Sequence, residues 1–270
     1  LFGYDIFFEN RIRNLWKKNP SSKKNPELFK KLYYYLPQFK NSRYFEIIKD
    51  FYKVNLKKNS IFYSHLVRWQ QYNHVSSFFN LNNNKRSTEK LLKKLEKLLP
   101  KNFSSLENDH KTQYLEISTL LSNYLLSSQG DRMTMANSVE GRYPFLDEDF
   151  VDSVCQVKPS LLAPNIESKK MFRNSFINKL PKEITNRPKV AYQAPEAKCF
   201  VNKNFISNDI IELIDNIDDL DLINKNNFLN LIEKFKDKNT SNRMGFRENM
   251  ALILGLSYLN LKKSIHNWSN

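Results

Sequence analysis

The sequence predicts a mainly α-helical protein. Runs in which apolar residues recur every three or four positions follow one another along the 270 residues, whereas strand-like runs are nearly absent. The chain is 40% hydrophobic and 13% aromatic, which is ample for a packed core. No repeat period appears, so a helical solenoid is disfavoured. The length suits one large globular domain or two small ones.

Helices are expected throughout the first 80 residues. Residues 1–18 open directly on an amphipathic helical pattern, and the polar cluster over 19–26 predicts a loop. Short helices are predicted over 27–36 and 44–54, and another over 61–79. Their spacing of aromatic and aliphatic residues is more typical of a core than of a stacking platform. The expected core residues are Leu28, Leu32, Tyr33, Phe45, Ile48 and Phe51.

The middle of the chain predicts two more helices. One should have Ser87 or Thr88 as its N-cap, present its lysines to water and end at Pro100. The other, over 112–128, is expected to be long and buried. Asp131 and Arg132 should therefore lie near the carboxyl end of a buried helix.

The second half continues the helical pattern. Asp147, followed by two acidic residues, is typical of the N-cap and first turn of a helix that reaches Val157. Further helices are predicted over 169–178, 228–235 and 247–265.

Composition disfavours several classes of function. The net charge of +15 suggests nucleic-acid binding, but the lysines are spread along a chain that is also rich in Asn, Ile, Phe and Tyr, which is typical of a biased genome. The two cysteines and four histidines have no metal-ligand spacing, and His65 and His74 are interpreted as structural. No signal peptide or run long enough to span a membrane is present, so a cytoplasmic protein without membrane or nucleic-acid partners is expected.

One stretch, residues 127–150, is a candidate site because it places charged residues among apolar ones. A charge beside apolar side chains must be paired or used, since burying it alone is costly. Pro144 disfavours a helix at Tyr143, so the stretch predicts helix, irregular loop and helix. On residue types alone, Asp147 is a helix cap, and Glu140 with Arg142 forms a structural ion pair.

The order of these residues gives a second interpretation. The string GDRMTMANSVEGRYPFLD, residues 130–147, resembles the signature of glutamine-hydrolysing asparagine synthetases, in the carboxyl-terminal half of their synthetase domain. A second string, over 180–200, resembles another signature of that half, with Arg187-Pro188-Lys189 followed by Tyr192-Gln193-Ala194-Pro195. Gly141 and Tyr143 are interpreted as variation within the family.

The resemblance implies a fold and a reaction. Residues 1–270 would be the helical carboxyl-terminal part of an α/β synthetase domain of the PP-loop ATPase type. The family adenylates a carboxylate with ATP, releases pyrophosphate, and lets ammonia from glutamine attack the acyl adenylate. With aspartate, the intermediate would be β-aspartyl-AMP and the product asparagine.

The resemblance also implies roles for individual residues. Cations must neutralise the charge that develops on the departing pyrophosphate. Lys189 is the principal candidate for this role, and Arg132 is the second. Asp131, Glu140, Arg142 and Asp147 are expected to shape the acyl and nucleotide pocket. Arg142 would hold Glu140 and Asp147 as an internal clamp. No metal ligand is assigned in this chain.

Parts of the family pattern are absent from the sequence. The chain begins with Leu1 just after the position of a family loop, and the Ser-Gly-Gly-x-Asp-Ser nucleotide loop and the amino-terminal glutaminase cysteine do not occur. ATP and Mg²⁺ are therefore expected to bind mainly to an upstream half. The expected partners are that half, a glutaminase domain and a second copy of the chain in a homodimer. Two alternatives stay open: a related amidotransferase for a sugar acid or peptide, and a non-catalytic basic helical binding module.

Overall fold

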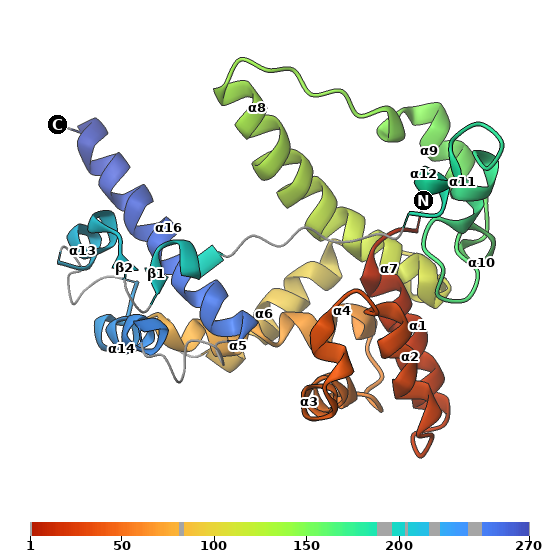
Figure 1. Ribbon diagram of the computed structural model, residues 1–270, viewed down its shortest axis with the longest axis horizontal. Helices are drawn as coiled ribbons and strands as arrows, with labels where there is room; N and C mark the ends of the chain where they lie inside the picture. The colour runs from red at the N-terminus through yellow and green to blue at the C-terminus, as the bar shows by residue number, and fades with distance from the viewer. Residues whose placement is uncertain are drawn as a thin grey trace. The chain divides into compact units, whose positions relative to one another are not determined.

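A computed structural model describes residues 2–80, 84–187, 196–202, 205–215, 222–236 and 245–269. The chain forms two compact units. Unit 1 comprises Leu1–Val67 and Pro100–Ala191, and unit 2 comprises Arg68–Leu99 and Tyr192–Asn270. Most of the described residues are helical, as the sequence predicts (Figure 1). None of the described helices combines the length and apolar content needed to cross a membrane.

Unit 1 is built around its first helix, α1, which packs against α2 and α7. Phe8, Ile12 and Trp16 of α1 are buried and form a core with aromatic residues of α2 and α3. The core predicted from sequence is confirmed, since Leu32, Tyr33 and Phe45 are buried and the other three residues pack against them. The helices of unit 1 are α1 (Asp5–Lys18), α2 (Lys24–Leu32), η1 (Pro37–Lys40), α3 (Ser42–Lys53), α4 (Tyr63–Trp69, whose end enters unit 2), η3 (Phe103–Ser105), α7 (Asn108–Glu116), η4 (Ile117–Asp131), α8 (Arg132–Ala136), η5 (Pro144–Leu146), α9 (Glu148–Cys155), α10 (Pro159–Leu162), α11 (Lys170–Ser175) and α12 (Lys182–Thr185).

Buried polar groups tie α1 to its neighbours. Arg13 is 1% exposed and donates hydrogen bonds to the backbone carbonyls of Tyr52 at 3.1 Å, Tyr63 at 2.9 Å and Val54 at 3.1 Å. Its guanidinium lies 4.3 Å from the centre of the Tyr63 ring. A buried cation is tolerated here because its donors find acceptors.

His65 has the structural role expected from the sequence. Its Nε2 lies 3.0 Å from Glu116 Oε2, and its Nδ1 lies 2.8 Å from Ser64 Oγ. All three side chains are buried. The pair therefore links α4 to the end of α7 inside the core of unit 1.

Unit 2 has its own core, formed mainly by α14 and α16. Phe228, Leu231 and Phe235 of α14 pack with Leu252 and Leu256 of α16. A two-stranded antiparallel sheet pairs Val201 with Ile206. The elements of unit 2 are α5 (Tyr72–Val75), η2 (Ser76–Phe78), α6 (Asn84–Lys97), η6 (Glu196–Cys199), β1 (Val201–Asn202), β2 (Phe205–Ile206), α13 (Asn208–Asp215), α14 (Lys225–Lys236) and α16 (Phe246–Ser269).

Two predictions for this part of the chain are wrong. The single helix expected over 61–79 is divided into α4, α5 and η2, with a turn after Trp69 that no glycine or proline marks in the sequence. The helix expected to start after Ser87 or Thr88 begins at Asn84 instead. The Thr88 hydroxyl does not cap the helix but donates to Asn73 Oδ1 at 2.7 Å.

Candidate functional site

The stretch singled out by sequence is a helix, a loop and a second helix, as predicted. Figure 1 shows α7 and α8 as the two ends of one unbroken helical rod, with η4 between them. Residues 137–143 form the irregular loop, and α9 begins at Glu148. The prediction that this helix is buried holds for α7, where Thr112, Leu115 and Glu116 are buried, but it is wrong for η4 and α8, which have no buried residue in the described structure.

The middle of the rod, η4, has π-helical geometry over 15 residues, although π-helix normally occurs as single turns. Its small polar side chains return hydrogen bonds to backbone carbonyls of the preceding turn. Ser122 Oγ donates to the Ile117 carbonyl at 2.8 Å, and Asn123 Nδ2 donates to the Ser118 carbonyl at 2.7 Å. Side chains of this kind compete with regular helical bonding, which favours the wider winding.

The rod ends in a Schellman motif centred on Ser138. The Val139 N–H donates to the Thr134 carbonyl at 2.9 Å, and the Ser138 N–H donates to the Met135 carbonyl at 3.1 Å. Ser138 has a φ of 55°, in the left-handed region that glycine usually fills. Because serine occupies this position, the sequence does not indicate the motif. The strained turn sets the direction of the loop that follows.

Tyr143 joins the loop to the end of η4. Its hydroxyl donates to Asp131 Oδ1 at 3.3 Å. A Cβ on Gly141 would lie 2.7 Å from this hydroxyl, and a Cβ on Gly130 would lie 2.9 Å from it. The two glycines thus make room for the phenol. Desolvation, and then the charge of Asp131, raise the pKa of Tyr143. From the sequence, Tyr143 was interpreted only as variation within the family, and Gly141 two positions before it was the available signal.

The predicted clamp around Arg142 is wrong. Arg142 Nη2 lies 2.5 Å from Glu140 Oε2, but the two side chains are 81% and 73% exposed. Asp147 Oδ1 instead accepts the Phe150 N–H at 3.1 Å and caps α9. The interpretation based on residue types, a helix cap and a separate ion pair, describes these three residues correctly.

The structure describes Arg132, one of the two candidate cations, but not Lys189. Arg132 is exposed at the start of α8, and its side chain forms no hydrogen bond or ion pair with the described residues. Lys189 lies outside the described residues. Arg187, two positions before it, offers its carbonyl to Arg173 Nη1 at 2.7 Å. Arg173 was not identified as a site residue from the sequence.

The signature exposes an apolar surface beside these charges. Met133, Met135, Val139 and Phe145 are each more than half exposed. These side chains lie at both ends of the loop, with Met133 and Met135 on α8 and Phe145 just before α9 (Figure 1), and all of them are open to contact with other segments. Within the described ranges, no group of three His, Cys, Asp or Glu side chains is arranged to hold a metal ion.

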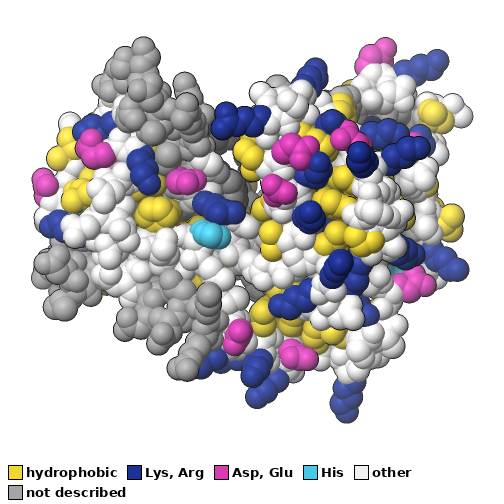
Figure 2. Space-filling model, turned by 90° about the horizontal axis from the view of Figure 1, so that it is seen from below, with side chains coloured by type: hydrophobic (Ala, Val, Ile, Leu, Met, Phe, Trp, Pro, Cys, Tyr) yellow, Lys and Arg dark blue, Asp and Glu magenta, His cyan; other side chains and the backbone are white. Residues whose placement is uncertain are grey.

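The face of the molecule seen in Figure 2 carries charges of both signs. Figure 2 shows Lys and Arg interspersed with Asp, Glu and apolar side chains over the face in view. Binding of the phosphate backbone usually requires a basic patch or stripe.

Comparison with known proteins gives a consistent family. The family model described as asparagine synthase matches residues 1–261. Asparagine synthetase (glutamine-hydrolyzing) 1 of Bacillus subtilis is 31% identical over 114 residues, which are 42% of this chain and 17% of that protein. Amidase chyE of Penicillium rubens is 35% identical over 92 residues, which are 32% of this chain and 14% of that protein. The probable asparagine synthetase of Acanthamoeba polyphaga mimivirus is 39% identical over 72 residues, which are 26% of this chain and 13% of that protein.

The matched segments thus span less than a fifth of each of these relatives. No solved structure matches the chain significantly.

Proposed function

This chain belongs to the asparagine synthase family, and from that premise we propose that it is part of an ATP-dependent ligase that forms an amide with ammonia taken from glutamine. The observation that supports the proposal most is the uninterrupted signature over residues 130–147, together with a family match over 1–261. The chain would supply the helical carboxyl-terminal part of the synthetase domain. Conversion of aspartate to asparagine is the proposed reaction.

The proposed reaction has two steps. A carboxylate oxygen of the substrate attacks the α-phosphorus of ATP, and the bond to the β-phosphate oxygen breaks, which releases pyrophosphate. The nitrogen of ammonia then attacks the acyl carbon, AMP leaves with the electron pair of the broken C–O bond, and the surplus proton is lost. Bound Mg²⁺ would neutralise phosphate charge. Its protein ligands would lie outside the described residues.

The residues of this chain would mainly neutralise charge on the phosphates and hold parts of the site in position. Arg132 is exposed and unpaired within the described residues, which suits a cation that meets a phosphate or carboxylate in the assembled enzyme. Lys189 is proposed as the cation that neutralises the departing pyrophosphate. The Asp131–Tyr143 hydrogen bond would hold the loop of the signature against the end of η4. Glu140 and Arg142, both exposed, would contact substrate or the rest of the enzyme directly instead of supporting the site from within.

The exposed apolar surface of the signature supports a site that is completed by other segments. The segments of this chain that align with the curated relatives cover less than a fifth of the length of those relatives. We propose that the nucleotide-loop half of the synthetase domain covers Met133, Val139 and Phe145, and that a glutaminase domain supplies ammonia. Cytoplasmic activity would fit such a metabolic ligase.

The relatives leave a second acceptor substrate open. The Penicillium relative named an amidase is 35% identical, which lies between the 31% and the 39% of the relatives named asparagine synthetases. A different carboxylate, such as a sugar acid or a peptide, is therefore the alternative substrate.

The test uses the longest natural protein that contains this sequence, supplied with ATP, Mg²⁺ and glutamine. We expect aspartate to stimulate pyrophosphate release with equal amounts of AMP and asparagine. Release stimulated only by another carboxylate would favour the alternative. Absence of release with every carboxylate tested would contradict the ligase assignment.

A further inference from the structure

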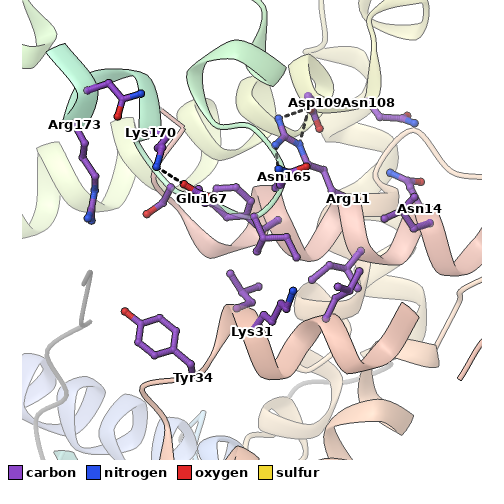
Figure 3. A pocket seen from close by; sticks show the side chains of 18 of the residues that line it. Arg11, Asn14, Lys31, Tyr34, Asn108, Asp109, Asn165, Glu167, Lys170 and Arg173 are labelled. Atoms are coloured by element: carbon purple, nitrogen blue, oxygen red, sulfur yellow. Dashed lines mark hydrogen bonds and ion pairs between the residues drawn. The ribbon is translucent and has the colours of Figure 1, made fainter. Parts of the chain in front are cut away.

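Unit 1 contains a trough. None of the described site residues that were predicted from the sequence lines it. It has a volume of about 1460 Å³ and lies between α1 and α2 on one side and residues 165–177 and 185–186 on the other (Figure 3). Small-molecule sites usually measure about 300–1,000 Å³. The trough therefore suits a ligand larger than an ordinary metabolite.

The trough presents apolar side chains from separate elements. Leu15 of α1 is 49% exposed, Tyr34 after α2 is 55% exposed, and Ile177 after α11 is 51% exposed. Leu28 and Ile166 add half-buried apolar surface to the same lining. Converging apolar side chains that remain open to water are typical of a surface that another molecule covers.

Cations stand on both sides of this apolar surface. Lys31 projects from α2, and Arg173 lies across the trough on α11 (Figure 3). Lys18 and Lys31 form no hydrogen bond or ion pair with the described part of the chain. Their charges are therefore available to a ligand.

Arg173 is anchored in a way that leaves donors available. Its Nη1 donates to the carbonyls of Thr185 at 3.4 Å and Arg187 at 2.7 Å. Its Nε and Nη2 have no partner among the described residues. A guanidinium that is fixed by one nitrogen and has two others available is suited to a carboxylate.

The acidic groups of the lining are largely used within the protein. Asp109 lies 2.8 Å from Arg11 Nη2, and Glu167 lies 2.7 Å from Lys170 Nζ. Arg11 also donates to the carbonyls of Pro159, Ala163 and Asn165. Glu107, the third acidic residue of the lining, forms no ion pair with the described residues, but Lys18, Lys31 and Arg173 outnumber it, so the charge left for a ligand is positive.

We propose that this trough binds an acidic amphipathic helix of a partner polypeptide. Two to three turns of helix, about 10 Å across and 11–16 Å long, occupy on the order of 1,000 Å³, which the trough can hold. The apolar face of such a helix would cover Leu15, Tyr34 and Ile177. Glutamates at its edges would meet Lys31 on one side and Arg173 on the other, the usual pattern of helix-in-groove recognition with charge complementarity.

The experiment measures binding of a fluorescein-labelled amphipathic peptide by fluorescence anisotropy. The peptide has about 14 residues, with leucine on one face and glutamate along both edges at helical spacing. The control peptide has the same composition in scrambled order, because a chain with a net charge of +15 attracts any acidic peptide. We expect the amphipathic peptide to bind at least about tenfold more tightly than the scrambled one.

Variants locate the binding. Lys31→Glu should lower the affinity for the amphipathic peptide about tenfold, and Arg173→Gln should lower that affinity by a comparable factor. Lys53→Glu is the matched control, since Lys53 is also exposed on a helix of unit 1 and outside the trough, and it should have little effect. Lys31 has no described partner, so Lys31→Glu should leave the circular dichroism spectrum and melting temperature unchanged. Equal binding of the two peptides, or equal losses in Lys31→Glu and Lys53→Glu, would overturn the proposal.

Discussion

At the scale of the residue, two arginines show how burial decides what a charge contributes. Arg13 is buried and donates to three backbone carbonyls, whereas Arg142 is 81% exposed and pairs with Glu140. Burial lowers the pKa of Arg13, an effect that the ring of Tyr63 and the carboxylate of Glu9 oppose. Arg142, which was expected from the sequence to hold an internal clamp, is therefore exposed, and the buried Arg13 was not identified from the sequence.

Arg13→Ala should lower the free energy of unfolding by roughly 3–5 kcal/mol, because it leaves buried acceptors unsatisfied and opens a cavity. Arg142→Ala, the matched control, should lower it by less than about 1 kcal/mol because an exposed pair is screened by water. Urea denaturation followed by circular dichroism measures both. Similar midpoints for the two variants would contradict this assignment of burial.

The raised pKa of Tyr35 in unit 1 predicts that stability depends on pH. Burial, and then the charge of Asp5 and a hydrogen bond to it, raise the pKa of Tyr35 from 10.0 to about 12. A pKa raised in the folded state means that the folded protein holds the proton more tightly than the unfolded chain. The resulting stabilisation is complete below pH 10 and is lost as the pH rises from 10 to about 12. Denaturation midpoints across this range should fall more steeply in the wild type than in Tyr35→Phe, and parallel curves would contradict the assignment.

At the scale of the element, α16 contains a glycine where a larger residue does not fit. A Cβ on Gly255 would overlap the ring of Phe228 on α14. Gly255→Ala should therefore destabilise unit 2 by about 1–3 kcal/mol through overpacking, although alanine normally stabilises a helix interior. Ser257→Ala, on the exposed side of α16, is the control and should be neutral or slightly stabilising. A higher melting temperature for Gly255→Ala would show that the two helices are not packed in this way.

Elements were predicted well where local chemistry defines them. The Asp147 cap, the amphipathic pattern of α1 and the aromatic spacing of α3 follow from side chains and their immediate neighbours. The π-helical winding of η4 depends on many weak side-chain bonds, and the turn after Ala136 has serine at a position that usually requires glycine, so neither was predicted. Spacing also shows which residues are apolar but not what covers them, and for this reason the signature helix was wrongly expected to be buried. Arg173 and Tyr143 were missed because their partners are distant in sequence or depend on the fold of the loop.

At the scale of the whole molecule, the account requires segments beyond those that bear the signature. The Ser-Gly-Gly-x-Asp-Ser loop, which would hold phosphates with backbone N–H groups, does not occur in residues 1–270. This polypeptide alone should therefore bind ATP only weakly, because separate cations do not replace such a loop. Calorimetry tests the expectation, and saturable micromolar binding would contradict it.

The chain is proposed to contribute cations to an adenylation reaction, and substitution of Lys189 examines that role. In the longest natural protein that contains this sequence, Lys189→Ala should slow carboxylate-dependent pyrophosphate release by about 10²- to 10³-fold, because a fixed ammonium stabilises the departing charge more in the transition state than in bound ATP. Hydrolysis of glutamine should be largely unchanged, and Lys189→Arg should restore activity only in part. Lys182→Ala, an exposed lysine on α12, is the control and should retain full activity.

The deciding measurement is a single-turnover assay of pyrophosphate release in these variants. We expect slower release only in Lys189→Ala and, to a smaller extent, in Lys189→Arg. Release by Lys189→Ala at the rate of the wild type would contradict the assigned role of Lys189 and leave Arg132 as the remaining candidate cation.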